Sequence, residues 1–195
     1  MIKDYALYKC VNLKSASFKN VTNIDTYAFG FCSKLTSVYF PNATNITGYA
    51  FYYCTSLPSV NFPNVIYIGA SAFYGCSKLK SVNFQSATNI GTSSFQSCSK
   101  LESAILQSAT YIGDSAFYGC SRFNTLVLGS NQVCQLASLY ALSSTPFASG
   151  GTGGTLYVPQ DLIESYQSAN NWSTILGYPN NQIKAIEGSI YDTNS

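Results

Sequence analysis

The chain has 195 residues, of which 46% are hydrophobic, so it is long enough for one domain with a sizeable core and a small appendage. Only 9% of the residues are charged, against roughly 25% in an average globular domain, and a formal net charge of +2 is too small to predict attraction to nucleic acid or to a membrane surface. The sequence has no histidine, which removes the commonest general base and the commonest metal ligand.

The segment from Met1 to Cys10 does not read as a signal peptide, because it lacks an apolar run and a small-residue cleavage site. No apolar stretch of the chain approaches the ~20 residues needed to cross a bilayer. The sequence therefore predicts no membrane insertion. It leaves two explanations open for the missing leader: a protein that is not exported by that route, or a piece of a longer chain.

A unit of 22 residues repeats through the first two thirds of the chain. Two of its apolar columns are isoleucines from Ile24 to Ile112 and phenylalanines from Phe29 to Phe117. A fixed period of roughly 20–50 residues with apolar columns is the mark of a solenoid, in which each unit forms one coil and buries its apolar face by stacking on its neighbours. The same step places the cysteines Cys10, Cys32, Cys54, Cys76, Cys98 and Cys120.

Within each unit, the L-x-x-V-x-F segment predicts a short strand. In the second unit it contains Leu35, Val38 and Phe40, and the alternation of a strand directs Val38 and Phe40 inward and Tyr39 outward. The A-F-x-x-C segment carries its apolar residues at a spacing that suits one helical or 3₁₀ turn on the opposite side of the coil.

The unit, written I-G-x-x-A-F-x-x-C-x-x-L-x-S-V, resembles the BspA-like class of leucine-rich repeats, which is found in bacterial surface proteins and some protist surface proteins. The resemblance is closest in residues 68–84 and 112–128 and covers about residues 1–130. It implies an α/β repeat fold, a right-handed leucine-rich-repeat solenoid of about six coils and ~29 Å in length. Units of the family are often a residue or two longer, which leaves the curvature of this solenoid open.

The first unit lacks its beginning, because Ile2 aligns with Ile24 and only Met1 precedes it. A solenoid needs polar caps to be soluble, and a bare end exposes apolar surface and unpaired strand groups. We therefore expect the N-terminal edge to pack against further repeats of a longer parent chain or against a partner.

The 22-residue period is lost from about Val133. A loop rich in glycine, serine and threonine leads to a predicted strand at Thr155–Val158. Pro159 is suited to open a helix with apolar side chains at helical spacing, and residues 181–187 predict a last short strand. This pattern resembles the C-terminal end of many BspA-like arrays in gut-type bacteria and their phages, which implies a helix laid over the last apolar edge. The predicted domains are a solenoid, residues 1–130, and a C-terminal cap, residues 131–195.

The cysteine column has three explanations. A metal site needs close pairs such as C-x-x-C, and the sequence contains none. Disulfides between neighbouring coils would fit a spacing of ~5 Å, but equivalent side chains point in parallel and the total of 7 cysteines is odd. Free buried cysteine behaves as a small hydrophobe, and this structural role is the explanation that the sequence favours.

No set of residues predicts a catalytic centre. The serines have neither a histidine nor a G-x-S-x-G motif to activate them. The 8 acidic residues fall in no repeated column, and Asp25 and Asp114 are four repeats apart, whereas a glycosidase pair needs carboxylates roughly 5–10 Å apart. We therefore predict that the protein is not an enzyme and that it holds no metal and no cofactor.

The outward columns of the predicted strands form one candidate binding surface. One column is rich in charged residues, a second is serine or threonine throughout, and a third contains tyrosine and asparagine. Leucine-rich repeats commonly bind on this face, and this argument rests on analogy with the family. The alternative is an ordinary solvated sheet surface. The predicted strand-face set is Lys14, Tyr39, Asn61, Lys80, Asn83 and Glu102.

Tyrosines form a second candidate surface. Tyrosine joins an apolar ring to a polar tip and is enriched at interfaces, and rings along a groove can also lie against sugar rings. The alternative is that the tyrosines only cover the turns and pack on one another. The main column holds Tyr8, Tyr52, Tyr74 and Tyr118, and neighbouring columns hold Tyr5, Tyr27, Tyr49, Tyr67 and Tyr111.

Together with the resemblance, these features predict a non-enzymatic binding or adhesion module of a bacterial surface protein, at the cell surface or secreted as part of a longer chain. Its partner would be a host or bacterial surface protein or a glycan, bound by many weak contacts along a rigid face. Nucleic acid is not an expected partner. The alternative function is a structural or receptor-binding component of a phage or prophage tail, located in the virion.

Overall fold

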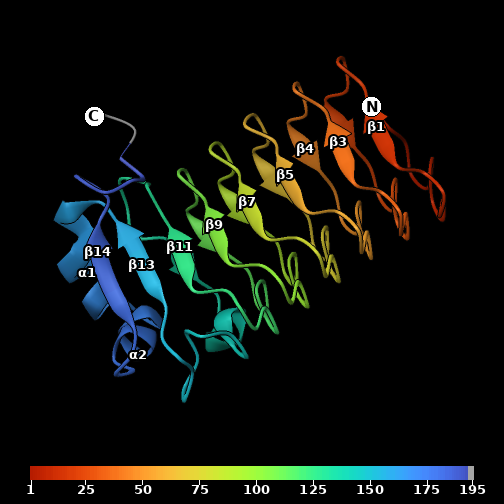
Figure 1. The fold of residues 1–195 in the computed structure, drawn as a ribbon. Helices are drawn as coiled ribbons and strands as arrows, with labels where there is room; N and C mark the ends of the chain where they lie inside the picture. The colour runs from red at the N-terminus through yellow and green to blue at the C-terminus, as the bar shows by residue number, and fades with distance from the viewer. Residues whose placement is uncertain (193–195) are drawn as a thin grey trace.

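The computed structural model describes residues 1–192, which form a solenoid of stacked coils (Figure 1). We number the coils 1 to 6 after their cysteines, from Cys10 in coil 1 to Cys120 in coil 6. The first sheet side holds the strands of the L-x-x-V-x-F segments and two strands of the cap: β1 (Ser15–Ser17), β3 (Ser37–Tyr39), β5 (Ser59–Asn61), β7 (Ser81–Asn83), β9 (Ser103–Ile105), β11 (Thr125–Val127), β13 (Thr155–Val158) and β14 (Gln182–Ala185). The second sheet holds β2 (Asn23–Ile24), β4 (Asn45–Ile46), β6 (Tyr67–Ile68), β8 (Asn89–Ile90), β10 (Tyr111–Ile112) and β12 (Gln135–Leu136).

The strands of neighbouring coils pair in parallel and in register with the repeat. On the first sheet side Val60 pairs with Val82, and in the second sheet Ile24 pairs with Ile46. Both pairs join residues 22 positions apart. This register confirms the predicted solenoid of about six coils.

Phenylalanine rings form a continuous stack through the core. From Phe29 to Phe117, neighbouring ring centroids are 5.1 to 5.4 Å apart and the ring planes are within 8° of parallel. These rings and the cysteine column are fully buried in coils 2 to 6. Burial of one such ring contributes about 1.5–3 kcal/mol, so each coil is stabilised mainly by the coils on either side.

The A-F-x-x-C segment forms consecutive tight turns, so the predicted helical or 3₁₀ turn is wrong. In coil 2 the amide of Gly30 donates to the carbonyl of Tyr27 within its own turn, whereas the amide of Phe29 donates to the carbonyl of Ala50 in the next coil at 2.8 Å. Tyr27 and Phe31 adopt positive φ angles of 55° and 60°. A helix would keep every amide in its own coil, and the alternation instead lets the turns bond to neighbouring coils as a sheet does.

The cysteines are free, which confirms their structural role over the disulfide explanation. In coils 2 to 6 each thiol donates a hydrogen bond to a carbonyl of the preceding coil, as Cys54 does to Phe29 at 3.1 Å. Burial raises the pKa of the Cys32 thiol to about 11 and holds the pKa of Cys98 well above its ordinary value. The bond between coils gives a reason for cysteine rather than alanine in this column.

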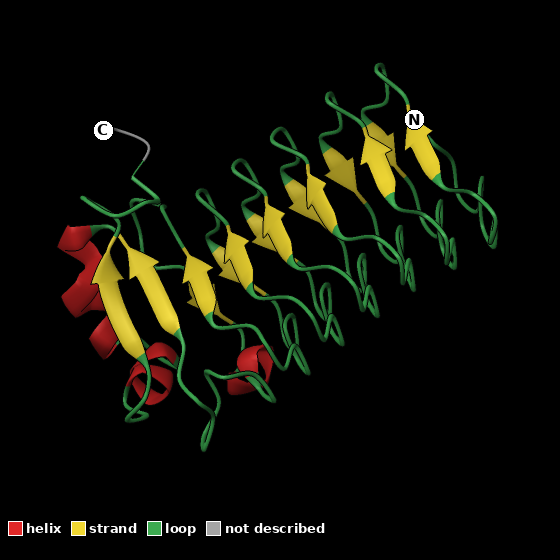
Figure 2. Cartoon of the chain, viewed as in Figure 1, coloured by secondary structure: helices red, strands yellow, loops and turns green. Residues whose placement is uncertain are grey.

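The chain beyond residue 130 closes the C-terminal end of the solenoid, where all the helices of residues 1–192 lie (Figure 2). β13 and β14 confirm the strands predicted at Thr155–Val158 and within residues 181–187. The helix predicted after Pro159 is also confirmed. The helical elements are η1 (Leu139–Leu142), η2 (Gln160–Leu162), α1 (Ile163–Ser168) and α2 (Trp172–Leu176).

Two aromatic side chains of the cap cover the last strand of the second sheet. Tyr166 of α1 and Trp172 of α2 are almost fully buried, with ring centroids 5.6 Å apart. The amide of Cys134, next to β12, donates to the Tyr166 hydroxyl at 2.9 Å, and the Trp172 indole donates to the Cys134 carbonyl at 2.6 Å. The cap therefore buries an apolar edge and also satisfies its backbone groups.

Both ladders of strands continue past residue 130. The predicted boundary between solenoid and cap thus coincides with the loss of the 22-residue period and not with the end of a sheet. Residues 193–195 of the predicted cap lie outside the described residues. Within the described part of the chain, every helix is too short or too polar to span a membrane.

Candidate binding site

The predicted strand-face set lies along the outer side of the first sheet in two rows. The charged members stand immediately before β1, β7 and β9 and are exposed. Tyr39, Asn61 and Asn83 are the last residues of β3, β5 and β7. Tyr39 is 57% exposed, Asn61 is exposed and Asn83 is half-buried. The structure therefore places the six residues on one face without bringing them into a single cluster.

The row that contains Tyr39 becomes buried toward the cap. Asn83 turns its side-chain oxygen inward, where it has no hydrogen-bond partner among residues 1–192. Two coils further on, Val127 is fully buried. It pairs with Tyr157 of β13, against which the ring of Tyr191 packs at 4.8 Å. The accessible part of this row is thus the part that belongs to coils 1 to 3.

The ladder of the first sheet is interrupted between β3 and β5. At the equivalent position of coils 2, 4, 5 and 6, the residue before the strand donates its amide to the preceding coil, as Thr36 does to Lys14 at 2.8 Å and Glu102 does to Lys80 at 2.8 Å. In coil 3 this residue is Pro58, which has no amide hydrogen to donate to Thr36. The proline therefore divides the sheet into the pair β1–β3 and a six-stranded part that begins with β5.

A shallow groove of about 400 Å³ lies at this interruption. Tyr39 and Asn61 of the predicted set line it, together with Ser37, Ser59 and neighbouring prolines, and no charged residue contributes to it. Val38 in the groove is only half-buried, whereas Val60 and Val82 at the equivalent positions are buried. The groove is therefore the place where the strand face departs from a flat solvated sheet.

The sequence pattern did not single out Pro58, which shares its outward column with Lys14, Lys80 and Glu102. The signal was present, because a proline inside a sheet removes a hydrogen bond of the ladder and is normally confined to edges and bulges. A proline next to a central strand of a solenoid thus predicts a local opening.

Eight aromatic rings gather on the tight turns of coils 1 to 4, and we call them the aromatic cluster. The ring of Tyr27 lies 5.2 Å from that of Tyr5 and 4.7 Å from that of Tyr49, nearly parallel to both. Edge-to-face contacts join this stack to the next column. The members are Tyr5, Tyr8, Tyr27, Phe31, Tyr49, Tyr52, Tyr53 and Tyr74.

The predicted tyrosine column is brought together only in part. Its first three members belong to the aromatic cluster, but Tyr118 lies two coils beyond Tyr74, with Gln96 at the position between them, and makes no ring contact with the described residues. Phe31 and Tyr53 are members that the sequence pattern did not indicate. Both adopt positive φ angles, a backbone conformation that is rare for bulky residues.

The rings of the aromatic cluster pack on one another and are half-buried, except Tyr5, Tyr49 and Tyr53, which are exposed. A Cβ atom at Gly30 would lie 2.9 Å from the ring of Tyr27, so glycine leaves the room that the rings need. Burial and the neighbouring tyrosines raise the pKa of Tyr27 and of Tyr52. Mutual packing of this kind fits the explanation that the tyrosines cover the turns, and Tyr5 is the most exposed ring of the cluster.

The described residues offer little for catalysis or metal binding. Residues 1–192 contain no group of three His, Cys, Asp or Glu side chains placed to hold a metal ion. The buried thiols have raised pKa values and are poor nucleophiles, since the thiolate is the reactive form. The carboxylate of Asp114 accepts hydrogen bonds from the hydroxyls of Ser115 and Ser138, which is a structural arrangement within the turns.

The 22-residue columns, the two parallel ladders and the turns between them point to one repeat family. The sequence profile of the BspA type leucine-rich repeat region matches residues 1–124 and 44–147, with six copies. The chain belongs to the BspA-type leucine-rich-repeat family. Repeats of this family occur in bacterial surface proteins, and the family is generally non-enzymatic.

Similar solved structures come from several bacteria. A leucine-rich repeat protein of T. pallidum has a TM-score of 0.64 and 24% sequence identity, over 91% of this chain and 77% of that one. A leucine-rich repeat protein of Bacteroides ovatus has a TM-score of 0.57 and 21% identity, over 81% of this chain and 49% of that one. A leucine rich cell surface protein of Faecalibacterium prausnitzii gives a TM-score of 0.48 with 19% identity, over 99% and 66% of the two chains. The first two likenesses agree on the leucine-rich-repeat fold. None of the curated proteins matches the chain.

Proposed function

We propose that this BspA-type chain is a non-enzymatic binding module at a bacterial cell surface and that it recognises a protein or a glycan through the groove between β3 and β5. The observation that carries the proposal is the interruption of the sheet at Pro58. It opens a groove of about 400 Å³ in the strand face, and Tyr39 and Asn61 line this groove.

The chemistry of the groove suits contacts with an uncharged partner. Tyr39 offers an aromatic ring that is 57% exposed, and large exposed rings supply much of the binding energy of interfaces. Asn61, Ser37 and Ser59 offer amide and hydroxyl groups for hydrogen bonds. One such groove gives weak binding, and display of many copies on a surface raises the overall affinity without new contacts.

The proposal is tested by binding of the purified, multimerised protein to an array of glycans and host matrix proteins. Tyr39→Ala and Asn61→Ala should each weaken a saturable interaction, with about tenfold expected for Tyr39→Ala, which corresponds to about 1.4 kcal/mol. Tyr5→Ala, in the aromatic cluster, is the matched control and should bind as the wild type does. Loss of binding in Tyr5→Ala alone would move the site to the aromatic cluster, and no binding at all would reject the proposal.

A second variant tests the role of the sheet opening itself. Pro58→Thr restores the amide that Thr36 carries at the equivalent position of coil 2. We expect the ladder between β3 and β5 to close, the new amide of residue 58 to be protected from hydrogen exchange, and the affinity for the partner to fall. Unchanged affinity in a variant with a protected amide would show that the opening is not needed.

A structural role is the second candidate function, and the N-terminal edge favours it. Phe18 in coil 1 is 46% exposed, whereas Phe40, one coil inward, is 1% exposed. β1 pairs only with β3 among the described strands, so its other edge is open. In a phage or prophage tail protein, this edge would pack against a partner or further repeats. Sedimentation of the wild type and of Phe18→Asn tests this role, because association that depends on this edge should disappear in the variant.

A further inference from the structure

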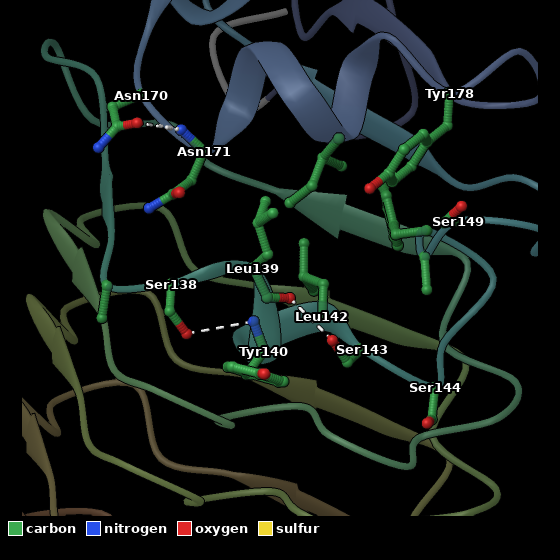
Figure 3. Close-up of a pocket in the computed structure, with 14 residues that line it drawn as sticks. Ser138, Leu139, Tyr140, Leu142, Ser143, Ser144, Ser149, Asn170, Asn171 and Tyr178 are labelled. Atoms are coloured by element: carbon green, nitrogen blue, oxygen red, sulfur yellow. Dashed lines mark hydrogen bonds between the residues drawn. The ribbon is translucent and has the colours of Figure 1, made fainter.

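The cap contains a second cavity that is distant in sequence from the groove at Pro58. It lies between η1 and α2 and has a volume of about 700 Å³ (Figure 3). Cavities that bind small molecules typically measure roughly 300–1,000 Å³. The repeats do not build this cavity, because both helices that flank it belong to the part of the chain without the 22-residue period.

The apolar side chains at the bottom of the cavity also pack into the hydrophobic core, which fixes their positions. Leu142, Phe147 and Ile175 line it and are otherwise almost fully buried. Tyr140 lines it as well but is 65% exposed, and the neighbouring Leu139 is 39% exposed. The cavity thus combines a fixed apolar floor with an exposed aromatic ring, and neither part has to fold when a ligand enters.

The polar part of the cavity is uncharged, and several of its groups have no hydrogen-bond partner among residues 1–192. None of the fourteen lining residues is Asp, Glu, Lys or Arg. The side-chain amide nitrogen of Asn171 donates to the carbonyl of Leu136 at 2.8 Å, which leaves its side-chain oxygen without a hydrogen bond among residues 1–192. The hydroxyl groups of Tyr178 and Ser149 also have no partner among these residues. Figure 3 shows Asn171 and Tyr178 on opposite sides of the view, with Leu139 between them.

The charge next to the cavity narrows the class of ligand. The carboxylate of Asp114 accepts a hydrogen bond from Ser138, which lines the cavity. A negative ligand would find no lining cation, and the carboxylate of Asp114 behind Ser138 would disfavour it. A purely apolar ligand would remove the amide and hydroxyl groups from water without giving them partners, which costs free energy. The remaining class is a neutral molecule that has both an apolar face and several hydroxyl groups.

We infer that the cap cavity is a binding site for a neutral sugar unit. One face of a pyranose ring presents C–H groups, which pack on Tyr140 and Leu139 above the apolar floor. Its hydroxyl groups bond to the Asn171 oxygen and to the Tyr178 and Ser149 hydroxyls. This site is separate from the groove proposed above and uses none of its residues.

The experiment titrates the full chain with methyl glycosides of glucose, galactose, mannose and N-acetylglucosamine, followed by saturation-transfer NMR and calorimetry. At least one of them should bind saturably with a Kd of about 0.1–10 mM. N-acetylneuraminic acid carries a carboxylate and should bind at least about tenfold more weakly. Tyr140→Ala should weaken binding about fivefold or more, and Ser149→Trp, which fills the cavity, should abolish it. Tyr39→Ala, in the groove at Pro58, is the control and should change nothing here.

Three results would overturn the inference. The first is the absence of saturable binding of every neutral glycoside up to about 50 mM. The second is equal binding of N-acetylneuraminic acid. The third is wild-type affinity in both Tyr140→Ala and Ser149→Trp. Because Tyr140 is largely exposed, its variant should keep the melting temperature of the wild type. Failure of the groove to bind a partner would leave these outcomes unaffected, so the two proposals fail independently.

Discussion

The two ends of the solenoid differ in how far they bury the side chains of the same core column. At the N-terminal end, Phe18 of coil 1 is 46% exposed. At the C-terminal end, Leu128 holds the equivalent position in coil 6 and is fully buried. The difference arises because β13 and the helices of the cap continue the stack beyond coil 6, whereas no coil precedes Phe18 among the described residues. A repeat thus supplies the apolar side chain, but only the next element along the stack buries it.

The sharpest way to test this comparison is to remove the same ring from the centre and from the N-terminal end. Phe84→Ala, in the same column as Phe18, should lower the free energy of unfolding by about 3–5 kcal/mol, because the ring is fully buried and its removal leaves a cavity. Phe18→Ala should cost less than about 1.5 kcal/mol, since much of its ring already contacts solvent. Urea denaturation followed by circular dichroism measures both. Equal losses would contradict the idea that burial comes from the neighbouring coil.

A buried thiol of the cap should make stability depend on alkaline pH. Burial raises the pKa of Cys134 from 9.0 to about 12, so the folded state holds this proton more tightly than the unfolded state does. The stabilisation is complete below pH 9 and is lost as the pH rises through 12, by at most about 1.4 kcal/mol per pH unit.

Urea titrations at about pH 8, 10 and 11 would measure this loss. Cys134→Ala should lose stability less steeply than the wild type over the same range, because tyrosines and the other thiols titrate in both proteins. Parallel slopes would show that the cap does not exclude water from this thiol.

The hydrogen bonds of the cap can be separated from its packing. Tyr166→Phe keeps the buried ring but removes the acceptor of the Cys134 amide. We expect a loss of about 1–3 kcal/mol, because a buried amide is left without a partner. Tyr140→Phe, which removes an exposed hydroxyl, is the control and should be neutral in the same urea experiment. A neutral Tyr166→Phe would mean that another group or water satisfies this amide.

The smallest expected difference concerns the thiols. Cys76→Ala removes the hydrogen bond to the carbonyl of Phe51 and should cost about 1 kcal/mol. Cys10→Ala should be close to neutral, because this thiol is partly exposed and donates no such bond. A thiol reagent should modify Cys10 in the native protein well before Cys76. Rapid labelling of Cys76 would show that the coils open locally.

The fold could be predicted from the sequence to the level of individual strands. The alternation of Val38, Tyr39 and Phe40 indicated a strand with one exposed side chain, and the strand at Thr155–Val158 was placed with the bounds that the structure has. The turns could not be predicted in the same way. The spacing of Phe29 and Cys32 fits a helix as well as it fits consecutive turns, and the choice depends on amides such as that of Phe29, which bond to the next coil.

For the candidate site, the sequence predicted the outward side of the strands but not the groove within it. Tyr39 and Asn61 were named correctly as outward residues, but their meeting in a groove depends on the amide that Pro58 lacks. Phe31 and Tyr53 of the aromatic cluster share a column with Gly75 and Gly119, and all four residues have positive φ angles. The glycines of this column were a signal of the turn conformation, but they do not show that the rings pack together. The cap cavity has no counterpart in any repeat, so no comparison between coils could have indicated it.

By itself, the sequence determined which side chains form the core and how the coils stack, because an apolar residue that recurs every 22 positions can be buried only by its own equivalents in the next coil. Only the tertiary structure decided where the stack departs from this rule: at the sheet opening beside Pro58, in the packed rings of the aromatic cluster and in the cavity of the cap. Each of these depends on which hydrogen bonds and contacts form between coils or within the cap, and the apolar columns of the repeat do not specify these contacts.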